Sequence, residues 1–380
     1  MGPRAQPAPE ETHVQRGDNR SMSIGQRRVG RWALCGLGVL MLFSPSCASS
    51  PGDPSPEHAA LAGFSPGGSF AALSDTDLER EVRAMASTGA TWIRLDLNWP
   101  AIEPERATWD WAATDRMVAA AQAQGLRVLA LPAYTPSWAR PEGTSDKYPP
   151  TEVSDFGRFV GEATRRYAPR GVHTWEIWNE PNAASFWAPR PDASAYTALL
   201  GAAAEAVRAV DGGATVISGG LAPGEDAGDG SFIAPATFLR QVYGAGGGGS
   251  FDAVAVHPYC YPASPLDRST SDWNAFIRLP EVHEVLASEG DGDRRVWLTE
   301  YGAPTGSGEG AVDEARQATL IRDGVVAARR WRWVGPLFVY SYRDSSEDPT
   351  DREANFGLVR RDFSPKPAWD AYRSAVVGAR

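Results

Sequence analysis

The stretch that decides the fold is VHTWEIWNEPN, residues 172–182. Its valine, isoleucine and two tryptophans favour a buried strand. Pro181 has no backbone N–H to donate to a neighbouring strand, so the strand must end before it. Glu180 is therefore the last residue of a buried strand, in aromatic surroundings where a carboxylate is costly to desolvate. A glutamate in that position either stabilises the rim of a sheet or takes part in chemistry.

Seven further stretches predict strands, and helical segments separate them. We predict the eight strands at residues 60–64, 91–98, 127–133, 172–180, 215–221, 251–257, 295–300 and 335–342. Helical segments with typical start and stop residues occupy residues 75–89, 111–125, 152–168, 192–210 and 312–331. Eight strand–helix units in succession fit a single (β/α)8 TIM barrel. A doubly wound open sheet is the rival fold, but the Gly-rich segment 63–70 lacks the spacing of a phosphate-binding turn.

The residues before the barrel have the composition of an export segment. Met22 is the expected true start, and arginines, an apolar run and small residues follow it in the order of an export signal. Cys47 follows the apolar run after Ser44-Pro45-Ser46 and resembles a bacterial lipoprotein attachment site, so lipidation of Cys47 and plain cleavage nearby are both open. The chain then divides into an upstream extension, an export signal, a flexible linker and a catalytic barrel at residues 1–21, 22–47, 48–58 and 59–380.

Charge and cysteine content restrict the partners and the location. The 380 residues carry a formal net charge of −10, which argues against nucleic acid and anionic membrane surfaces as partners. The cysteines are Cys35, Cys47 and Cys260, and Cys35 would leave with the signal, so we expect no disulfide framework and no thiolate metal cluster. An exported chain without disulfides indicates an extracellular or cell-envelope protein of a bacterium.

Polar side chains gather where the predicted strands end. Active sites of such barrels lie at the carboxyl ends of the strands. Asn179 and Glu180 end the fourth strand and Glu300 ends the seventh, which lies across the barrel mouth from it. Arg94 on the second strand, and the sequence HPY at 257–259 after the sixth, come from the same rim.

Two carboxylates that face each other suit cleavage of a glycosidic bond. One must arrive protonated to give its proton to the leaving oxygen, and the other must be ionised to attack the anomeric carbon. Their surroundings must therefore separate their pKa values. We expect Trp178 and Trp187 to form an apolar wall beside one carboxylate, and Arg94, His257 and Tyr259 to donate hydrogen bonds toward Glu300.

These segments resemble a known group of enzymes. WEIWNEPN at 175–182 and VWLTEYG at 296–302 are similar to the two signature segments of the clan A retaining glycoside hydrolases. The resemblance implies that Glu180 is the acid/base, that Glu300 is the nucleophile and that Asn179 contacts the sugar 2-hydroxyl. It also implies that Arg94, which matches the strand-two arginine, lies near the nucleophile. His257 and Tyr259 match the strand-six His-x-Tyr, which steadies the nucleophile.

The resemblance extends to particular families but leaves the substrate open. TPSWA at 135–139 is similar to the strand-three loop of family 39 members and related family 5 cellulase-like barrels. The last strand departs from the pattern, because FVYSYRD at 338–344 lacks the tryptophan that many family 5 cellulases place there.

Further candidates follow from position alone. Trp138 and Trp187 lie in predicted loops, where we expect them to stack on sugar rings, and Tyr342 on the eighth strand is a further candidate substrate-binding residue. Glu176 has the same side-chain parity as the glutamate that ends its strand, but it lies about 13 Å below the rim. We therefore expect Glu176 to be a buried structural partner of Arg94 or of another inward arginine.

The sequence thus predicts an exported retaining glycoside hydrolase that acts on a β-linked oligo- or polysaccharide. No cofactor is required, and we expect no metal, because the loop GEDAGDG at 224–230 offers too few oxygen ligands at fixed spacing. Two alternatives stay open. One is a surface glycan-binding lipoprotein on a non-catalytic barrel, and the other is a transglycosylase that uses the same residues.

Overall fold

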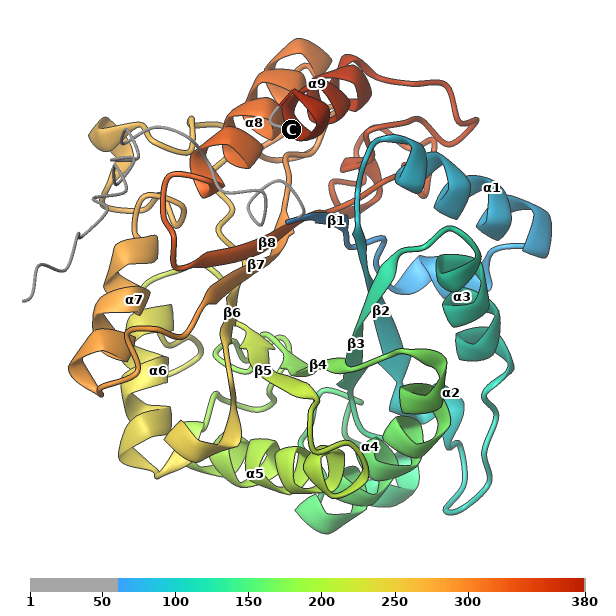
Figure 1. The fold of residues 1–380 in the computed structure, drawn as a ribbon. Coiled ribbons are helices and arrows are strands. Elements are labelled where there is room, and N and C mark those ends of the chain that lie inside the picture. The colour runs from blue at the N-terminus through green and yellow to red at the C-terminus, as the bar shows by residue number, and fades with distance from the viewer. Residues whose placement is uncertain (1–60, 379–380) are drawn as a thin grey trace, which may run out of the picture. The chain divides into compact units, whose positions relative to one another are not determined.

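The computed structural model describes residues 61–378, which form a barrel of alternating strands and helices (Figure 1). The predicted export signal, the linker and Cys47 lie outside the described residues. The strands are β1 Ala62–Phe64, β2 Trp92–Asn98, β3 Arg127–Ala133, β4 Thr174–Asn179, β5 Thr215–Gly220, β6 Val254–Val256, β7 Val296–Tyr301 and β8 Val334–Val339.

All eight strands run parallel and surround one axis. Their hydrogen-bonded order is β5-β4-β3-β2-β1-β8-β7-β6. Isolated parallel bridges between Ile217 and Ala253 and between Leu221 and Val256 join β5 to β6 and close the ring. The predicted single (β/α)8 barrel is therefore confirmed.

The helices form a layer around the strands (Figure 1). They are α1 Asp75–Ser87, α2 Trp99–Ile102, α3 Ala112–Ala123, α4 Val153–Tyr167, α5 Ala193–Val210, α6 Pro235–Gly244, α7 Leu279–Ser288, α8 Glu314–Ala328 and α9 Pro367–Val377. Five of them, α1, α3, α4, α5 and α8, lie where the sequence predicts helical segments. Within residues 61–378, no helix is both long and apolar enough to cross a membrane.

Strand β2 shows how the barrel interior is filled. Its alternate residues Trp92, Arg94 and Asp96 point inward, because successive side chains of a strand take opposite faces. Trp92 lies at the bottom and packs against Trp297 and Phe338, with ring centroids 5.2 and 6.4 Å away, in an apolar plug. The charged side chains therefore occupy only the upper part of the interior, toward the carboxyl ends of the strands.

Candidate active site

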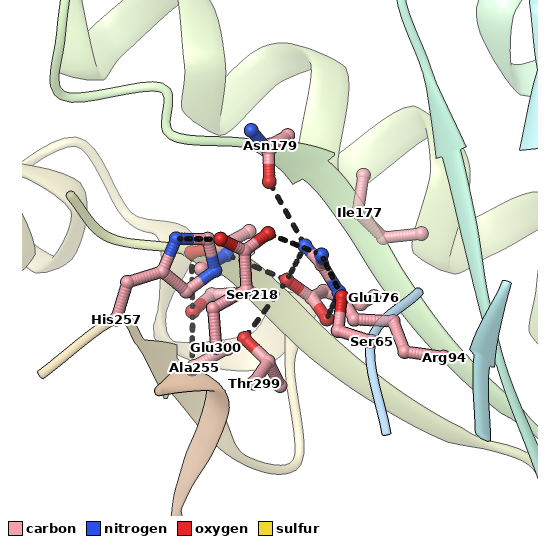
Figure 2. Close-up of polar contacts among 12 residues, drawn as sticks. Ser65, Arg94, Glu176, Ile177, Asn179, Ser218, Ala255, His257, Thr299 and Glu300 are labelled. Atoms are coloured by element: carbon pink, nitrogen blue, oxygen red, sulfur yellow. Dashed lines mark hydrogen bonds and ion pairs between the residues drawn. The ribbon is translucent and has the colours of Figure 1, made fainter. Parts of the chain in front are cut away.

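Arg94 lies at the centre of the upper interior and joins three strands (Figure 2). Its Nε and Nη2 donate to the two carboxylate oxygens of Glu176 on β4, at 2.8 and 2.9 Å. Nη2 also donates to Asn179 Oδ1 at 2.9 Å, and Nη1 donates to Glu300 Oε1 on β7 at 2.6 Å. The prediction that Glu176 is the buried partner of Arg94 is confirmed. One guanidinium thereby fixes a structural carboxylate, an amide and a rim carboxylate relative to one another.

Glu176 is fully buried and has further donors. The backbone N–H of Gly220 donates to its Oε1 at 2.9 Å, and the Thr299 hydroxyl donates to the same oxygen at 3.2 Å. Together with the two bonds from Arg94, these contacts compensate the loss of hydration. Glu176 is therefore an anion that holds β2, β4, β5 and β7 together, and it faces no open space.

Glu300 is held in its ionised form. Its Oε1 accepts from Arg94, and its Oε2 accepts from the Tyr259 hydroxyl at 2.9 Å. Burial raises the pKa of Glu300, but the positive charges of His257 and Arg94 and the hydrogen bond from Tyr259 outweigh burial, so the pKa lies below its usual value. A buried carboxylate that keeps its charge near neutral pH can act as a nucleophile.

Glu180 has the opposite electrostatic setting. It follows β4 with φ 47°, and its backbone N–H donates to Gly220 O at 2.9 Å. Burial raises the pKa of its carboxyl, the contact with His257 offsets part of this, and the charge of Glu300 raises it further. The net pKa lies above the usual value, so Glu180 keeps its proton to higher pH than an ordinary glutamate does.

The two glutamates lie close together across the barrel mouth. Carboxylate oxygens of Glu180 and Glu300 and a ring nitrogen of His257 all lie within 4.8 Å of one another. His257 Nδ1 is 2.8 Å from Glu180 Oε1 and 3.6 Å from Glu300 Oε2. The sequence predicted that His257 donates toward Glu300, and the structure corrects this. The closer contact is with Glu180, although His257 also lies within ion-pair distance of Glu300.

Gly220 makes room for this arrangement. A Cβ atom on Gly220 would lie 2.2 Å from His257 Nε2 and 2.8 Å from the Thr299 hydroxyl, distances that real Cβ atoms do not adopt. Its peptide N–H binds Glu176 and its carbonyl accepts from the backbone of Glu180. His257 Nε2 is buried and has no hydrogen-bond partner in the described part of the chain. The ring is therefore positioned by packing on Gly220, by an edge-on contact with the Tyr259 ring at 6.5 Å and by its Nδ1 contact.

The pair opens into a cavity of about 510 Å³. Its aromatic lining comes from two sides. Tyr134 and Phe186 follow β3 and β4, and a mutually packed cluster follows β6 and β8. The members of that cluster are Tyr259, Tyr261, Tyr340 and Phe356. Such a volume with convergent polar groups is typical of a small-molecule site.

Four predicted substrate-binding residues do not line this cavity: His257, which lies behind Glu180, and three aromatic residues. Trp187 is 1 % exposed and packs edge-on against Trp178 at 5.3 Å, so it belongs to the core. Tyr342 is 2 % exposed and packs edge-on against Phe64 at 5.3 Å. Trp138 is half-buried, and its indole N–H donates to Glu103 O at 2.9 Å. The rings of Trp187 and Tyr342 are enclosed by protein, so the prediction that they bind sugar is corrected. For Trp138, which does not line the cavity, it stays a prediction.

Four lining residues lie next to the predicted ones. Phe186 lines the cavity where Trp187 was predicted, and Tyr340 lines it where Tyr342 was predicted. Asp96 and Tyr134 also line it, on β2 and directly after β3. Phe186, Tyr134 and Tyr340 follow strands, and Asp96 is an inward residue two positions before the end of β2, so position near a strand end was the signal that could have identified them.

The same residues have the ligand types of a metal site, but their surroundings disfavour one. Glu180, His257 and Glu300 are the only group within residues 61–378 with suitable spacing for a metal ion. Both oxygens of Glu300 already accept hydrogen bonds, and the guanidinium of Arg94 lies 2.6 Å from one of them. A divalent cation there would be repelled by that charge. The residues present fit a pair of acid and nucleophile better than a metal centre.

Comparison with solved structures gives the same barrel. A family 39 glycoside hydrolase from Bacteroides cellulosilyticus is 26% identical with a TM-score of 0.65, over 84% of this chain and 64% of that chain. A β-xylosidase from Caulobacter crescentus is 20% identical with a TM-score of 0.60, over 82% and 67%. A family 5 subfamily 18 protein from Streptomyces cattleya, solved with GlcNAc, is 17% identical with a TM-score of 0.65, over 84% and 80% to 81% of the chains.

The predicted resemblance to family 39 and family 5 clan A barrels is confirmed. The chain spans about two thirds of the length of the family 39 enzymes, and the lower identities show the fold alone. A sequence model of the family 42 glycoside hydrolases, described as β-galactosidase, matches residues 70–182, which end within the first signature segment. No curated protein matches the sequence.

Proposed function

We propose that the protein is a retaining glycoside hydrolase that cleaves a β-linked oligo- or polysaccharide by double displacement. The observation that carries the proposal is the Glu180–Glu300 pair, in which oxygens of two carboxyls lie within 4.8 Å and the two pKa values are shifted in opposite directions. Retaining enzymes hold their carboxyl groups about 5–5.5 Å apart, whereas inverting enzymes leave room for a water between them.

In the first step, Glu300 attacks the anomeric carbon of the bound sugar. A bond forms between the Glu300 carboxylate and that carbon, the glycosidic bond breaks, and the proton of Glu180 passes to the leaving oxygen. In the second step, the now ionised Glu180 takes a proton from water, and the water oxygen displaces Glu300 from the sugar. The opposite pKa shifts supply the starting protonation states that this sequence requires.

The neighbours of the pair have assignable tasks in this proposal. Arg94 and Tyr259 hold the Glu300 carboxylate by one oxygen each, which fixes its direction of attack. Asn179 accepts from Arg94 through Oδ1, so its NH₂ points away from the guanidinium and can donate to the sugar 2-hydroxyl (Figure 2). His257 contacts Glu180 through Nδ1. In this proposal it stays in contact with the Glu180 carboxyl when that group loses its proton in the first step and regains one in the second.

Intact-protein mass spectrometry with 2,4-dinitrophenyl 2-deoxy-2-fluoro-β-glycosides tests the mechanism. The panel holds the xyloside, glucoside, galactoside and mannoside. We expect one glycosyl unit to attach to the wild-type protein, on the peptide that contains residues 296–302. Glu300→Gln should fold normally by circular dichroism, should not be labelled, and should lose turnover by on the order of 10⁴- to 10⁶-fold.

The other outcomes each have a meaning. Labelling of another residue, or of Glu300→Gln, would refute the nucleophile assignment. A folded protein that binds glycans but yields neither adduct nor product would favour the non-catalytic alternative. Transfer of the glycosyl unit to an added sugar in preference to water would favour the transglycosylase.

We also propose that the protein acts outside the cytoplasm, possessing a lipid on Cys47. The support is the order of charged, apolar and small residues over 22–47. Cells labelled with an alkyne fatty acid should yield a labelled protein in the membrane fraction, and Cys47→Ala should abolish the label. A wild-type protein that is cleaved and released without label would agree with export but would contradict a lipid on Cys47.

A further inference from the structure

Three polar side chains of the described chain face the cavity without a side-chain hydrogen bond. Asp96, Tyr134 and Tyr340 all line it. Within residues 61–378, neither the Asp96 carboxylate nor either phenol hydroxyl takes part in a hydrogen bond or ion pair between side chains. The three groups face one space, and the charge of Asp96 raises the pKa of both phenols, after burial and, for Tyr340, after the charges of Glu300 and Glu353. Polar groups left unpaired in a protein interior are expected to meet a ligand or water.

The backbone at this place is also unusual. Tyr134 has φ 72°, in the left-handed region that bulky residues rarely adopt. Trp178, whose ring packs edge-on against Tyr134 at 5.9 Å, has φ 70°. Such strain persists only where surrounding structure maintains it, and it clusters at functional sites. The direction of the Tyr134 side chain is therefore imposed by its surroundings.

The charges that line the cavity select against an anionic ligand. The cations among its lining residues are Arg94 and Arg352, and each is already in an ion pair with a glutamate. Lys147, which lies over the Tyr134 ring with Nζ 3.0 Å from the centroid, is paired with Asp146 at 3.3 Å. No lining cation of the described chain is thus left to receive a carboxylate of the ligand.

The position of Asp96 relates it to the reacting centre. It lies two residues after Arg94 on β2, one inward step closer to the rim. Burial raises the pKa of Asp96, and the charge of Glu300 raises it further. Asp96 lines the same cavity as Glu300, one inward step along β2 from the arginine that donates to Glu300. A sugar whose anomeric carbon meets Glu300 would have other parts of its ring in this cavity.

We propose that Asp96 is a specificity residue, whose carboxylate accepts hydrogen bonds from hydroxyls of the sugar that Glu300 attacks, with Tyr134 and Tyr340 beside it. The inference rests on the proposed function and names its substrate class. The sugar transferred to Glu300 is neutral, with hydroxyls as donors, and a uronic acid is rejected. An ionised carboxylate can only accept hydrogen bonds, so it matches hydroxyls and repels a second carboxylate.

Labelling kinetics of Asp96→Asn test the inference. The probes are the neutral fluoroglycoside that labels the wild-type protein fastest and the corresponding fluoroglucuronide. We expect the second-order rate constant of Asp96→Asn for the neutral probe to fall about 10- to 100-fold, the range for lost hydrogen bonds to a charged group. The half-saturating probe concentration should rise by a larger factor than the maximal labelling rate falls. The preference of the wild-type protein for the neutral probe should narrow at least about tenfold.

A matched control removes one charge elsewhere. Glu205→Gln changes an exposed carboxylate on α5 to its amide and should label like the wild-type protein. Unchanged labelling of Asp96→Asn, or an unchanged preference for the neutral probe, overturns the inference. It leaves the proposed function intact, because the adduct still forms.

Labelling of the wild-type protein distinguishes failure of the proposed function from failure of this inference. If no probe labels it, calorimetric titration with glucose, xylose, galactose and mannose replaces labelling. Weaker binding to Asp96→Asn than to the wild-type protein would then support Asp96 as a sugar-binding residue. Equal binding, or no binding to either protein, overturns the inference.

Discussion

Two acidic side chains inside the barrel, Glu176 and Asp96, lie beside the same arginine but differ in their hydrogen bonds and in their access to the cavity. Glu176 accepts two hydrogen bonds from Arg94, one from Gly220 and one from Thr299. Asp96 accepts none within the described residues and lines the cavity. We call Arg94, Glu176 and Thr299 the lower layer, and Asp96, Glu180 and Tyr340 the upper layer.

The difference shows that one interior serves two purposes. The lower layer satisfies its own charges and thereby fixes the strands that carry the site. Within the described residues, the upper layer leaves the Asp96 carboxylate and the Tyr340 hydroxyl without a side-chain hydrogen bond, and the Glu180 carboxyl contacts only His257. This costs folding free energy but leaves these groups free for a ligand. Changes in the lower layer should therefore affect stability first, and changes in the upper layer should affect activity with little loss of stability.

Glu180→Ala should give the largest effect of an upper-layer change. We expect kcat on a substrate with a poor leaving group to fall about 10²- to 10⁴-fold, because the leaving oxygen loses its acid. Azide should restore turnover of a dinitrophenyl glycoside, since that leaving group needs no proton and azide replaces the activated water. Thermal unfolding should be close to that of the wild-type protein. An unfolded variant without azide rescue would place Glu180 in the lower layer.

Glu176→Gln should reduce stability most among the lower-layer changes. Removing one partner of a buried ion pair leaves Arg94 under-compensated and typically costs about 3–5 kcal/mol. Urea denaturation followed by tryptophan fluorescence measures the loss. A midpoint within error of the wild-type value would show that Glu300 and Asn179 alone satisfy the arginine, and the two layers would then not be distinct.

Asp96→Asn should change stability in the opposite direction. Burial raises the pKa of Asp96 to about 6, partly offset by Arg94 and reinforced by Glu300. Because this pKa exceeds that of an unfolded aspartate, about 3.9, the folded wild-type chain loses stability as pH rises from about 4 to 6. Asp96→Asn should therefore gain about 1–2 kcal/mol at pH 8 and nothing below pH 4. Denaturation at both pH values measures this, and a loss at pH 8 would contradict it.

The smallest expected effect is a difference in kcat/KM between variants of two tyrosines that follow β8, Tyr340 and Tyr342. Tyr340→Phe removes a hydroxyl that faces the cavity, and we expect kcat/KM to fall about tenfold, as for one lost hydrogen bond. Tyr342→Phe removes a hydroxyl from the core and should leave kcat/KM within about twofold. Steady-state kinetics on the same glycoside give both values. Equal losses would show that the segment after β8 acts as one unit.

The barrel could be predicted because its elements are locally encoded. Strand parity placed Arg94 and Glu176 inside the barrel, and Pro181 predicted the end of β4 at Glu180, one residue after the observed end at Asn179. Ser74 caps α1 through the backbone N–H of Asp77, as a serine at that position does in many helices.

The cavity lining could be predicted only in part, because parity fails where strands end. The sequence extended the last strand to residue 342, which gave Tyr340 and Tyr342 the same face. The structure ends β8 at Val339, so alternation no longer holds for either tyrosine. Trp187 stands in a loop, yet Trp178 and Tyr196 bury it, and such packing between distant segments has no local signal.

Gly220 has a consequence for how the site can evolve. Because a Cβ there would lie 2.2 Å from the His257 ring, no side chain can be accepted at 220 while histidine stays at 257. Evolution must therefore change these positions in a fixed order, with a smaller residue at 257 first and a larger one at 220 afterwards. Related sequences that keep histidine at this position should keep the glycine, and those that lost the glycine should already have lost the histidine.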